Sequence, residues 1–224
     1  MRALVVCAHG TDNPQGQDVV RSIVAQVAGA RPDLVVREAY VDVQQPELPV
    51  VVNELAAQHD SVTVVPLLLS SGFHTEVDVA NAVESHANAT ATRALGPHDL
   101  LADVLTDRLR SAGADEGDSI VLAVAGSSRD AGATDAEAMR DLLAQRRSGP
   151  VSIGYLAARE PSVPDAVAAA RRSGQSVALA SYLIGPGFFH DRLQRAGVDV
   201  VADPLGDDPR LAQLVALRFA GVEN

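Results

Sequence analysis

Three side chains able to bind a metal or carry a proton lie beside apolar segments in the first third of the sequence. His9 follows the apolar segment 3–8, Asp42 lies at the end of segment 34–43, and His74 follows segment 62–69. Imidazole and carboxylate groups suit borderline divalent metals such as iron, cobalt and nickel. Neutral imidazole also accepts a proton near pH 7. If the three residues meet in space, they predict a site that handles a divalent metal and protons.

The segments that must bring these residues together alternate in type. Short runs of Val, Ile and Leu without polar alternation are typical of strands buried on both faces of a sheet. The stretches between them show helical spacing, and this alternation predicts a parallel α/β architecture. Ligands of such sheets bind at the carboxyl ends of the strands, where His9, Asp42 and His74 are expected. The predicted strands are residues 3–8, 34–43, 62–69, 90–95, 120–125, 151–156, 177–184 and 198–202, and the predicted helices include residues 17–28, 48–58, 77–85, 100–110, 135–146, 164–172 and 209–218.

The sequence repeats internally. Residues 42–46 correspond to 157–161 and residues 67–73 to 182–188, both at an offset of 115, and Leu95-Gly96 recurs as Leu205-Gly206. A unit of this length suits a four-stranded, doubly wound parallel sheet. We therefore expect two similar lobes, residues 1–114 and 115–224, joined by a polar linker at 113–118 and facing each other across a cleft. One barrel made of two half-barrels is the alternative.

The second copy retains the apolar strands and the glycines but lacks the three polar residues. Residues that only support the fold should be needed in both copies. The first lobe is therefore predicted to contain the active site, and the second lobe a degenerate copy of it. The counterparts of His9, Asp42 and His74 are Ala125, Ala157 and Phe189, with His190 displaced by one position.

Other polar residues have simpler interpretations. Asp42 itself could initiate a turn after its strand. Asp78, four residues after His74, could orient that histidine or add negative charge to the first turn of a helix. Cys7 lies within an apolar strand and is predicted to be a buried small hydrophobe. The remaining histidines are predicted to be surface residues: His59, His86, His98 and His190.

Composition excludes several classes of protein. The 18 basic residues against 29 acidic ones give a formal charge of −11, which argues against sequence-independent nucleic-acid binding. The sequence contains no apolar run long enough for a transmembrane helix, and the apolar N-terminal segment is too short for a signal peptide. A single cysteine excludes an internal disulfide and a cysteine-based zinc cluster. We expect a cytoplasmic protein that binds neither membranes nor nucleic acid.

The motifs around these residues resemble the sirohydrochlorin chelatases, which insert cobalt or iron into a tetrapyrrole. The likeness rests on Ala8-His9-Gly10, on residues 39–46, and on the segment 65–74 (VPLLLSSGFH) with Asp78 beyond it. Leu95-Gly96-Pro97-His98 matches a weaker family signature. The resemblance covers the first half, and the duplication extends it over nearly the whole chain.

The resemblance implies a two-lobed α/β fold and a lyase of siroheme or cobalamin biosynthesis. His9 and His74 would be metal ligands and proton acceptors, and Asp42, where the family often has glutamate, would be a third catalytic residue. The metal, Fe²⁺, Co²⁺ or Ni²⁺, is a substrate, so no permanently bound cofactor is implied. The residues implied to line the tetrapyrrole are Gln44, Leu69, Ser70, Ser71, Gly72 and Phe73.

The sequence departs from the family pattern in two places. Thr11-Asp12 replaces the usual Ser-Arg after His-Gly, which removes one cation expected to contact substrate carboxylates. Asp42 is also shorter than glutamate. In the second lobe, Arg129 and Arg159 are candidates for pairing with those carboxylates.

Two other functions remain alternatives. A metal or tetrapyrrole carrier of the same fold would use the same histidines without turnover. A histidine phosphatase would need an arginine directly before the histidine, but Ala8 stands there. Whether iron or cobalt is the metal, and whether the protein is a monomer or a weak homo-oligomer, are left open by the sequence.

Overall fold

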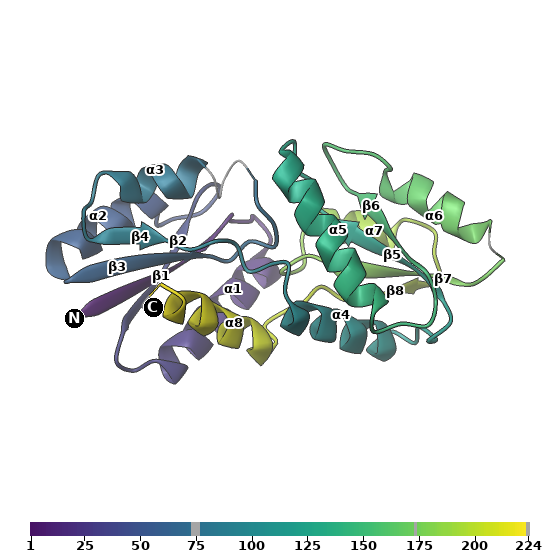
Figure 1. Cartoon of the computed structure of the whole chain (residues 1–224), viewed down its shortest axis with the longest axis horizontal. Coiled ribbons are helices and arrows are strands. Elements are labelled where there is room, and N and C mark those ends of the chain that lie inside the picture. The colour runs from purple at the N-terminus through teal and green to yellow at the C-terminus, as the bar shows by residue number, and fades with distance from the viewer. Residues whose placement is uncertain (73–76, 173, 223–224) are drawn as a thin grey trace. The chain divides into compact units, whose positions relative to one another are not determined.

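The computed structural model describes residues 1–72, 77–172 and 174–222. Two separate four-stranded parallel sheets form the framework (Figure 1), which confirms the predicted fold class and excludes the single barrel. The contacts divide the chain into two compact units. One contains Met1–Leu95 and the segment from Asp207 onward, and the other contains Gly96–Gly206.

The first unit has the strand order β2-β1-β3-β4, so β1 lies in the interior of the sheet. Helices α2 and α3 pack together on one side, and α1 and α8 pack together elsewhere in the unit. The strands are β1 (Arg2–Ala8), β2 (Val35–Tyr40), β3 (Ser61–Pro66) and β4 (Ala89–Ala91), and the helices are α1 (Pro14–Ala30), α2 (Leu48–Gln58), α3 (Val79–Glu84) and α8 (Pro209–Ala220).

The second unit repeats this arrangement with the order β6-β5-β7-β8. Helix α4 packs against α5 and β7, while α6 packs against β5 and β6. The strands are β5 (Ser119–Val124), β6 (Val151–Tyr155), β7 (Val177–Tyr182) and β8 (Val200–Val201), and the helices are α4 (Asp99–Ser111), α5 (Asp130–Ala144), α6 (Val163–Arg171) and α7 (Phe188–Gln194).

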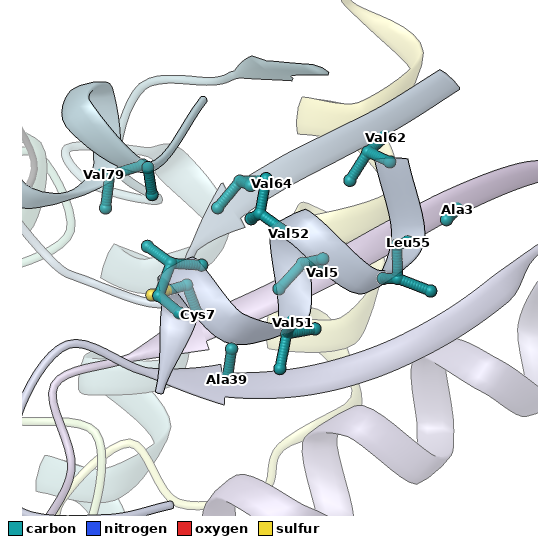
Figure 2. Close-up of a cluster of buried hydrophobic side chains, with 12 residues drawn as sticks. Ala3, Val5, Cys7, Ala39, Val51, Val52, Leu55, Val62, Val64 and Val79 are labelled. Atoms are coloured by element: carbon teal, nitrogen blue, oxygen red, sulfur yellow. The ribbon is translucent and has the colours of Figure 1, made fainter. Parts of the chain in front are cut away.

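A cluster of small and branched apolar side chains joins the first sheet to α2. Figure 2 shows Val5, Val52 and Val64 pointing toward one another from β1, α2 and β3, with Cys7 at one end of the cluster. Val5, Val52 and Val64 are fully buried. Burying each such side chain contributes about 1.5–3 kcal/mol, so this cluster holds β1, and the residue that follows it, in a fixed position.

The boundary between the two compact units differs from the predicted boundary after residue 114, because the chain passes from one unit to the other after Leu95 and again after Gly206. Helix α4, the last helix of the first sequence half, belongs to the second unit, and α8, the last helix of the second half, belongs to the first. The buried residues of α4 recur in α8 at an offset of 110, so the two helices present equivalent apolar faces. The pairs are Leu101 and Leu211, Ala102 and Ala212, Val104 and Leu214, Leu105 and Val215, and Leu109 and Phe219.

Each exchanged helix is also held by an equivalent arginine. Arg218 of α8 donates from Nε to the carbonyl oxygen of Ala94 at 2.9 Å. Arg108 of α4 donates from Nη2 to the carbonyl oxygen of Leu205 at 2.8 Å. The repeated Leu-Gly pairs therefore mark the places where the chain crosses from one unit to the other.

The predicted linker 113–118 lies inside the second unit and docks there. The Ser148 hydroxyl donates to the carbonyl oxygen of Glu116 at 2.8 Å, and the Gly149 amide donates to the same oxygen at 3.0 Å. The buried Arg147 side chain donates to the carbonyl oxygen of Asp115. Polar composition predicted a linker between the two lobes, but these hydrogen bonds make the segment part of the second unit.

Candidate active site

His9 lies at the carboxyl end of β1, between the loops that follow β2 and β3. Strand β1 pairs with both neighbours along its length, up to Ala8 with Tyr40 and Cys7 with Pro66. This register brings the residue after β1 beside the residues after β2 and β3. The prediction that these strand ends meet at one edge is confirmed for the described residues.

Gly10 allows the loops after β1 and β2 to touch. Its φ is +101°, and a Cβ at this position would lie 2.1 Å from the carbonyl oxygen of Asp42. No side chain fits in that space, so the residue after His9 must be glycine. The close approach is completed by the Asp42 amide, which donates to the His9 carbonyl oxygen at 3.0 Å.

One ring nitrogen of His9 lies close to a backbone carbonyl oxygen. Nδ1 lies 3.4 Å from the carbonyl oxygen of Gly10. A carbonyl oxygen can only accept, so this contact is a hydrogen bond in the tautomer that carries its proton on Nδ1 and its lone pair on Nε2. In that tautomer, Nε2 is the nitrogen able to bind a divalent metal or accept a proton.

Asp42 stabilises the turn in which it lies. Its Oδ1 accepts from the Val43 amide at 2.8 Å, and Val43 adopts a left-handed φ of 62°. The turn role considered from the sequence is therefore present. The backbone contact with His9 also keeps Asp42 next to the first histidine.

Gln44 connects the two loops through its side chain. Its Oε1 accepts from the Thr11 amide at 2.9 Å, while Gln17 Nε2 donates to the Thr11 carbonyl oxygen at 2.8 Å. Both backbone polar groups of Thr11 are thus held by amide side chains. Gln44 consequently braces the His9 loop, in addition to lying near the predicted substrate rim.

The predicted substrate loop is described only in part. The Leu67 amide donates to the Cys7 carbonyl oxygen at 2.7 Å, which extends the β1–β3 pairing beyond Pro66. The next residues of this loop are half-buried at the same edge of the sheet: Leu69, Ser70, Ser71 and Gly72. Phe73 and His74 lie outside the described residues. Among the described residues, no group of three or more His, Cys, Asp and Glu is placed to hold a metal.

Beside this edge lies a pocket of about 770 Å³ between α2, α3 and the loop after β2. Asp42 and Gln44 line it together with Asp78, Asn81 and His86. The pocket lining includes Asp78, Asn81 and Ser85. Their spacing of three and four residues places them on one face of α3, and this spacing is visible in the sequence. His86, interpreted from the sequence as a surface residue, is half-buried in the pocket wall.

The second unit reproduces the backbone of the site without its polar side chains. The Ala157 amide donates to the Ala125 carbonyl oxygen at 2.9 Å, as the Asp42 amide does to His9. Gly126 has a φ of +95°, and a Cβ on it would lie 1.9 Å from the carbonyl oxygen of Ala157. Because the loop geometry persists with alanines, neither His9 nor Asp42 is required to form it.

Two other histidines have structural roles that the sequence did not reveal. His190 is 7% exposed, not a surface residue, and its Nε2 lies 3.1 Å from Gln194 Nε2. Burial lowers the pKa of His190, an effect that the nearby Asp203 and Asp191 carboxylates oppose. His98 begins α4, where its Nδ1 accepts from the Leu100 amide at 3.1 Å.

Cys7 matches its prediction as a buried hydrophobe. Its side chain is completely buried, and burial together with the negative charge of Asp78 raises the pKa of the thiol to about 12. The thiol therefore stays protonated at neutral pH, and thiolate ligation of a metal is disfavoured.

No helix in the described part of the chain is long and apolar enough to cross a membrane.

Known proteins resemble both halves of this chain. The family model described as CbiX matches residues 3–112 and again residues 119–222. Sirohydrochlorin cobaltochelatase from Methanothermobacter thermautotrophicus is 26% identical over an alignment of 131 residues, and the match covers 49% of this chain and 91% of that protein. The protein of the same name from Methanococcoides burtonii is 26% identical over 123 residues, covering 47% of this chain and 92% of that protein.

Solved structures share the fold at lower identity. SirB from Bacillus subtilis with Fe³⁺ has a TM-score of 0.82 and 17% identity, covering 98% of this chain and 94% of that chain. CbiX, described as the terminal enzyme for biosynthesis of siroheme in denitrifying bacteria, has a TM-score of 0.70 and 19% identity, covering 99% of both chains. Since the family model matches both halves of the sequence, the chain belongs to the CbiX family.

Proposed function

We propose that this protein is a chelatase that inserts a divalent metal, Fe²⁺ or Co²⁺, into sirohydrochlorin. Support comes from the CbiX match over both halves and from the names of the curated relatives. The structural observation that carries the proposal is the difference between the two units. The first keeps His9 and Asp42 at an edge whose backbone the second unit builds with alanines.

In the proposed reaction, the protein holds the metal only briefly. His9 binds M²⁺ through Nε2, and His74 is the second proposed ligand. Two imidazoles leave further metal positions to water, so the ion is held less tightly than in a closed four-ligand site. Moderate affinity suits a substrate that must leave the protein.

The charge balance of the reaction requires proton acceptors, and we propose that the same imidazole side chains fill this role. As M²⁺ enters the macrocycle, two pyrrole N–H bonds break and two protons leave. The imidazole nitrogens released by the departing metal can accept these protons, so the total charge at the site is conserved. Asp42, held beside the His9 backbone, is proposed as a relay that passes protons toward solvent.

The test is anaerobic incubation of the protein with sirohydrochlorin and Fe²⁺ or Co²⁺. We expect the absorption spectrum of the metallated product to develop much faster than without protein, over many turnovers for each protein molecule. Competition between the two metals in one mixture measures which is preferred. Transfer limited to one metal for each protein molecule would indicate a carrier, and equal rates with and without protein would exclude the chelatase function.

A further inference from the structure

Two matched turns contain the described residues that adopt a positive φ although they carry a side chain. Val43 has a φ of 62°, and Ala158, its counterpart in the second unit, has a φ of 63°. In each turn the amide of the following residue donates to the carbonyl oxygen of the preceding residue. The bonds are Gln44 to Asp42 at 2.6 Å and Arg159 to Ala157 at 2.9 Å. A three-residue turn with this bond and a positive φ is rare and strained.

The first unit has a valine in this turn, although valine is poorly suited to it. Left-handed backbone crowds the Cβ of an L-residue against a carbonyl oxygen, and a β-branched side chain adds to the crowding. The Val43 side chain is 51% exposed, so burial of its methyl groups does little to offset the strain. Alanine is sufficient for the same turn in the second unit. The fold therefore does not require valine, and strain of this kind points to a role in function.

The strained residue also donates the hydrogen bond that holds the Asp42 carboxylate. Asp42 Oδ1 accepts from the Val43 amide at 2.8 Å, and a bond to a charged oxygen offsets part of the strain. The second unit has alanine at the matching position, Ala157, which has no side-chain oxygen to offer. The conformation of Val43 and the position of the carboxylate are thus coupled in the first unit. If the turn relaxes, the Val43 peptide group can rotate and Oδ1 is released.

The two ends of this turn are fixed, while its middle is free to move. The Asp42 amide donates to the His9 carbonyl oxygen at 3.0 Å, and Gln44 Oε1 accepts from the Thr11 amide at 2.9 Å. Between these anchors the exposed Val43 side chain lines the pocket of about 770 Å³. A change of conformation at Val43 therefore needs no repacking of buried side chains.

We propose that Val43 is a positioning residue whose strain keeps the turn balanced between two states. In the held state, which the structure shows, the Val43 amide binds Asp42 Oδ1. In the released state Val43 has a relaxed backbone, and the carboxylate is free to take part in metal insertion. Strain raises the energy of the held state, so the released state is reached more often than with a residue that fits the turn. The inference rests on the proposed function and concerns the first unit by itself.

Substitutions at Val43 change the strain without altering Asp42. Glycine adopts a positive φ without crowding, so Val43→Gly should favour the held state by about tenfold, equivalent to about 1.4 kcal/mol. We expect kcat for metal insertion to fall by about the same factor. KM for sirohydrochlorin and the Kd for Co²⁺ should stay within about twofold, because the held state already predominates before binding. Val43→Ala, which copies the second unit, should have an intermediate kcat.

Two further variants separate strain from other effects of the side chain. Val43→Thr keeps the β-branched shape but replaces a methyl group with a hydroxyl, so it should retain most of the wild-type kcat. Ala158→Gly relieves the matched turn of the second unit and should leave kcat unchanged. Both glycine variants should be at least as thermally stable as the wild type, since glycine fits both turns. A merely structural role of Val43 would not lower kcat in a protein of undiminished stability.

Amide hydrogen exchange tests the two states without any substrate. In metal-free protein the Gln44 amide is bonded within the turn only in the held state. Its protection against exchange, measured by NMR, should therefore rise by about tenfold in Val43→Gly and stay near the wild-type value in Val43→Thr. The Arg159 amide should gain protection in Ala158→Gly, while the Gln44 amide of that variant should not change.

The outcomes distinguish this inference from the function beneath it. Unchanged protection of the Gln44 amide in Val43→Gly would overturn the two-state turn, and so would a normal kcat alongside raised protection. A Val43→Thr variant as impaired as Val43→Gly, with a raised KM, would also overturn it, since the apolar side chain would then act by contact. A wild type that inserts no metal would overturn the proposed function, and amide exchange would still decide whether the turn has two states.

Discussion

At the scale of single residues, the second unit serves as an internal control for the first. Ala125 and Ala157 take the same backbone hydrogen bonds as His9 and Asp42. The polar side chains at this edge are therefore dispensable for folding, and their effects should appear in activity.

His9→Ala should lower metal insertion by about 10²-fold or more, the scale expected of an acid–base group, because it removes the Nε2 lone pair. Thermal stability should change little, since alanine occupies the matched position in the second unit. Steady-state insertion rates and thermal unfolding of the same preparation measure both quantities. His74→Ala should match the loss of activity, and normal activity in both variants would contradict the proposed ligand pair.

Asp42→Asn separates a proton relay from a metal ligand. Asparagine keeps an oxygen for the Val43 amide but removes the charge and the basic oxygen. If Asp42 is a relay, the Asp42→Asn variant should lose turnover while its Kd for Co²⁺ stays nearly unchanged. Isothermal calorimetry at fixed pH measures that Kd, and a rise of tenfold or more, about 1.4 kcal/mol, would make Asp42 a ligand.

His190 makes the stability of the second unit pH-dependent. Burial lowers its pKa in the folded protein, so the unfolded chain takes up a proton first as the pH falls. The stabilising effect of the neutral ring is complete above the unfolded pKa of about 6.5 and declines as the pH falls through that value toward the folded pKa.

Replacing His190 should remove this pH dependence. The free energy of unfolding of His190→Gln should change less between about pH 7 and 5 than that of the wild type. Urea unfolding at a series of pH values measures the difference, with His86→Gln as a control at a half-buried histidine of the first unit. Insertion activity per folded molecule should remain within a few-fold, and a parallel pH dependence in wild type and variant would show that other groups dominate.

At the scale of the elements, the two touching loops of each unit offer a matched pair of substitutions. Gly10→Ala and Gly126→Ala both place a Cβ against a backbone carbonyl oxygen, at 2.1 and 1.9 Å. Each should destabilise the protein by about 1–3 kcal/mol, as expected for strained backbone. Only Gly10→Ala displaces the segment that holds His9, so it should lose far more activity at equal stability. Denaturant unfolding and insertion rates measure the pair, and equal losses of activity would contradict a site confined to the first unit.

At the scale of the whole molecule, each sequence half is completed by a helix from the other half. The equivalent buried faces of α4 and α8 predict how an isolated half behaves. A fragment of residues 1–114 lacks α8 but contains α4, whose apolar face fits the same kind of surface. We expect two copies to exchange α4 and form a dimer.

Sedimentation of this fragment over a range of concentrations tests the expectation. Leu105→Asp, on the buried face of α4, should leave it monomeric and poorly folded, whereas Arg110→Asp, at an exposed position of the same helix, should not. A compact, stable monomer of residues 1–114 would show that the helix exchange is not needed for folding.

The sequence by itself determined the type and order of the elements. Runs such as residues 120–125 contain Val, Ile and Leu without polar alternation, which predicts strands buried on both faces of a parallel sheet. The duplication is visible in the sequence and predicted the paired sheets, while the parallel architecture predicted that His9 and Asp42 lie at one edge. Those inferences succeed because strand direction and side-chain type decide them locally.

Only the tertiary structure decided which half each terminal helix completes and how deeply particular polar residues are buried. The buried apolar positions of α4 and α8 follow the same pattern, so the local sequence does not indicate which sheet each helix packs against. The burial of His190 and the docking of the 113–118 segment likewise depend on partners far along the chain, such as Ser181, Arg147 and Gly149. These features follow from long-range packing, in which the free energy depends on contacts that residue type and local spacing do not specify.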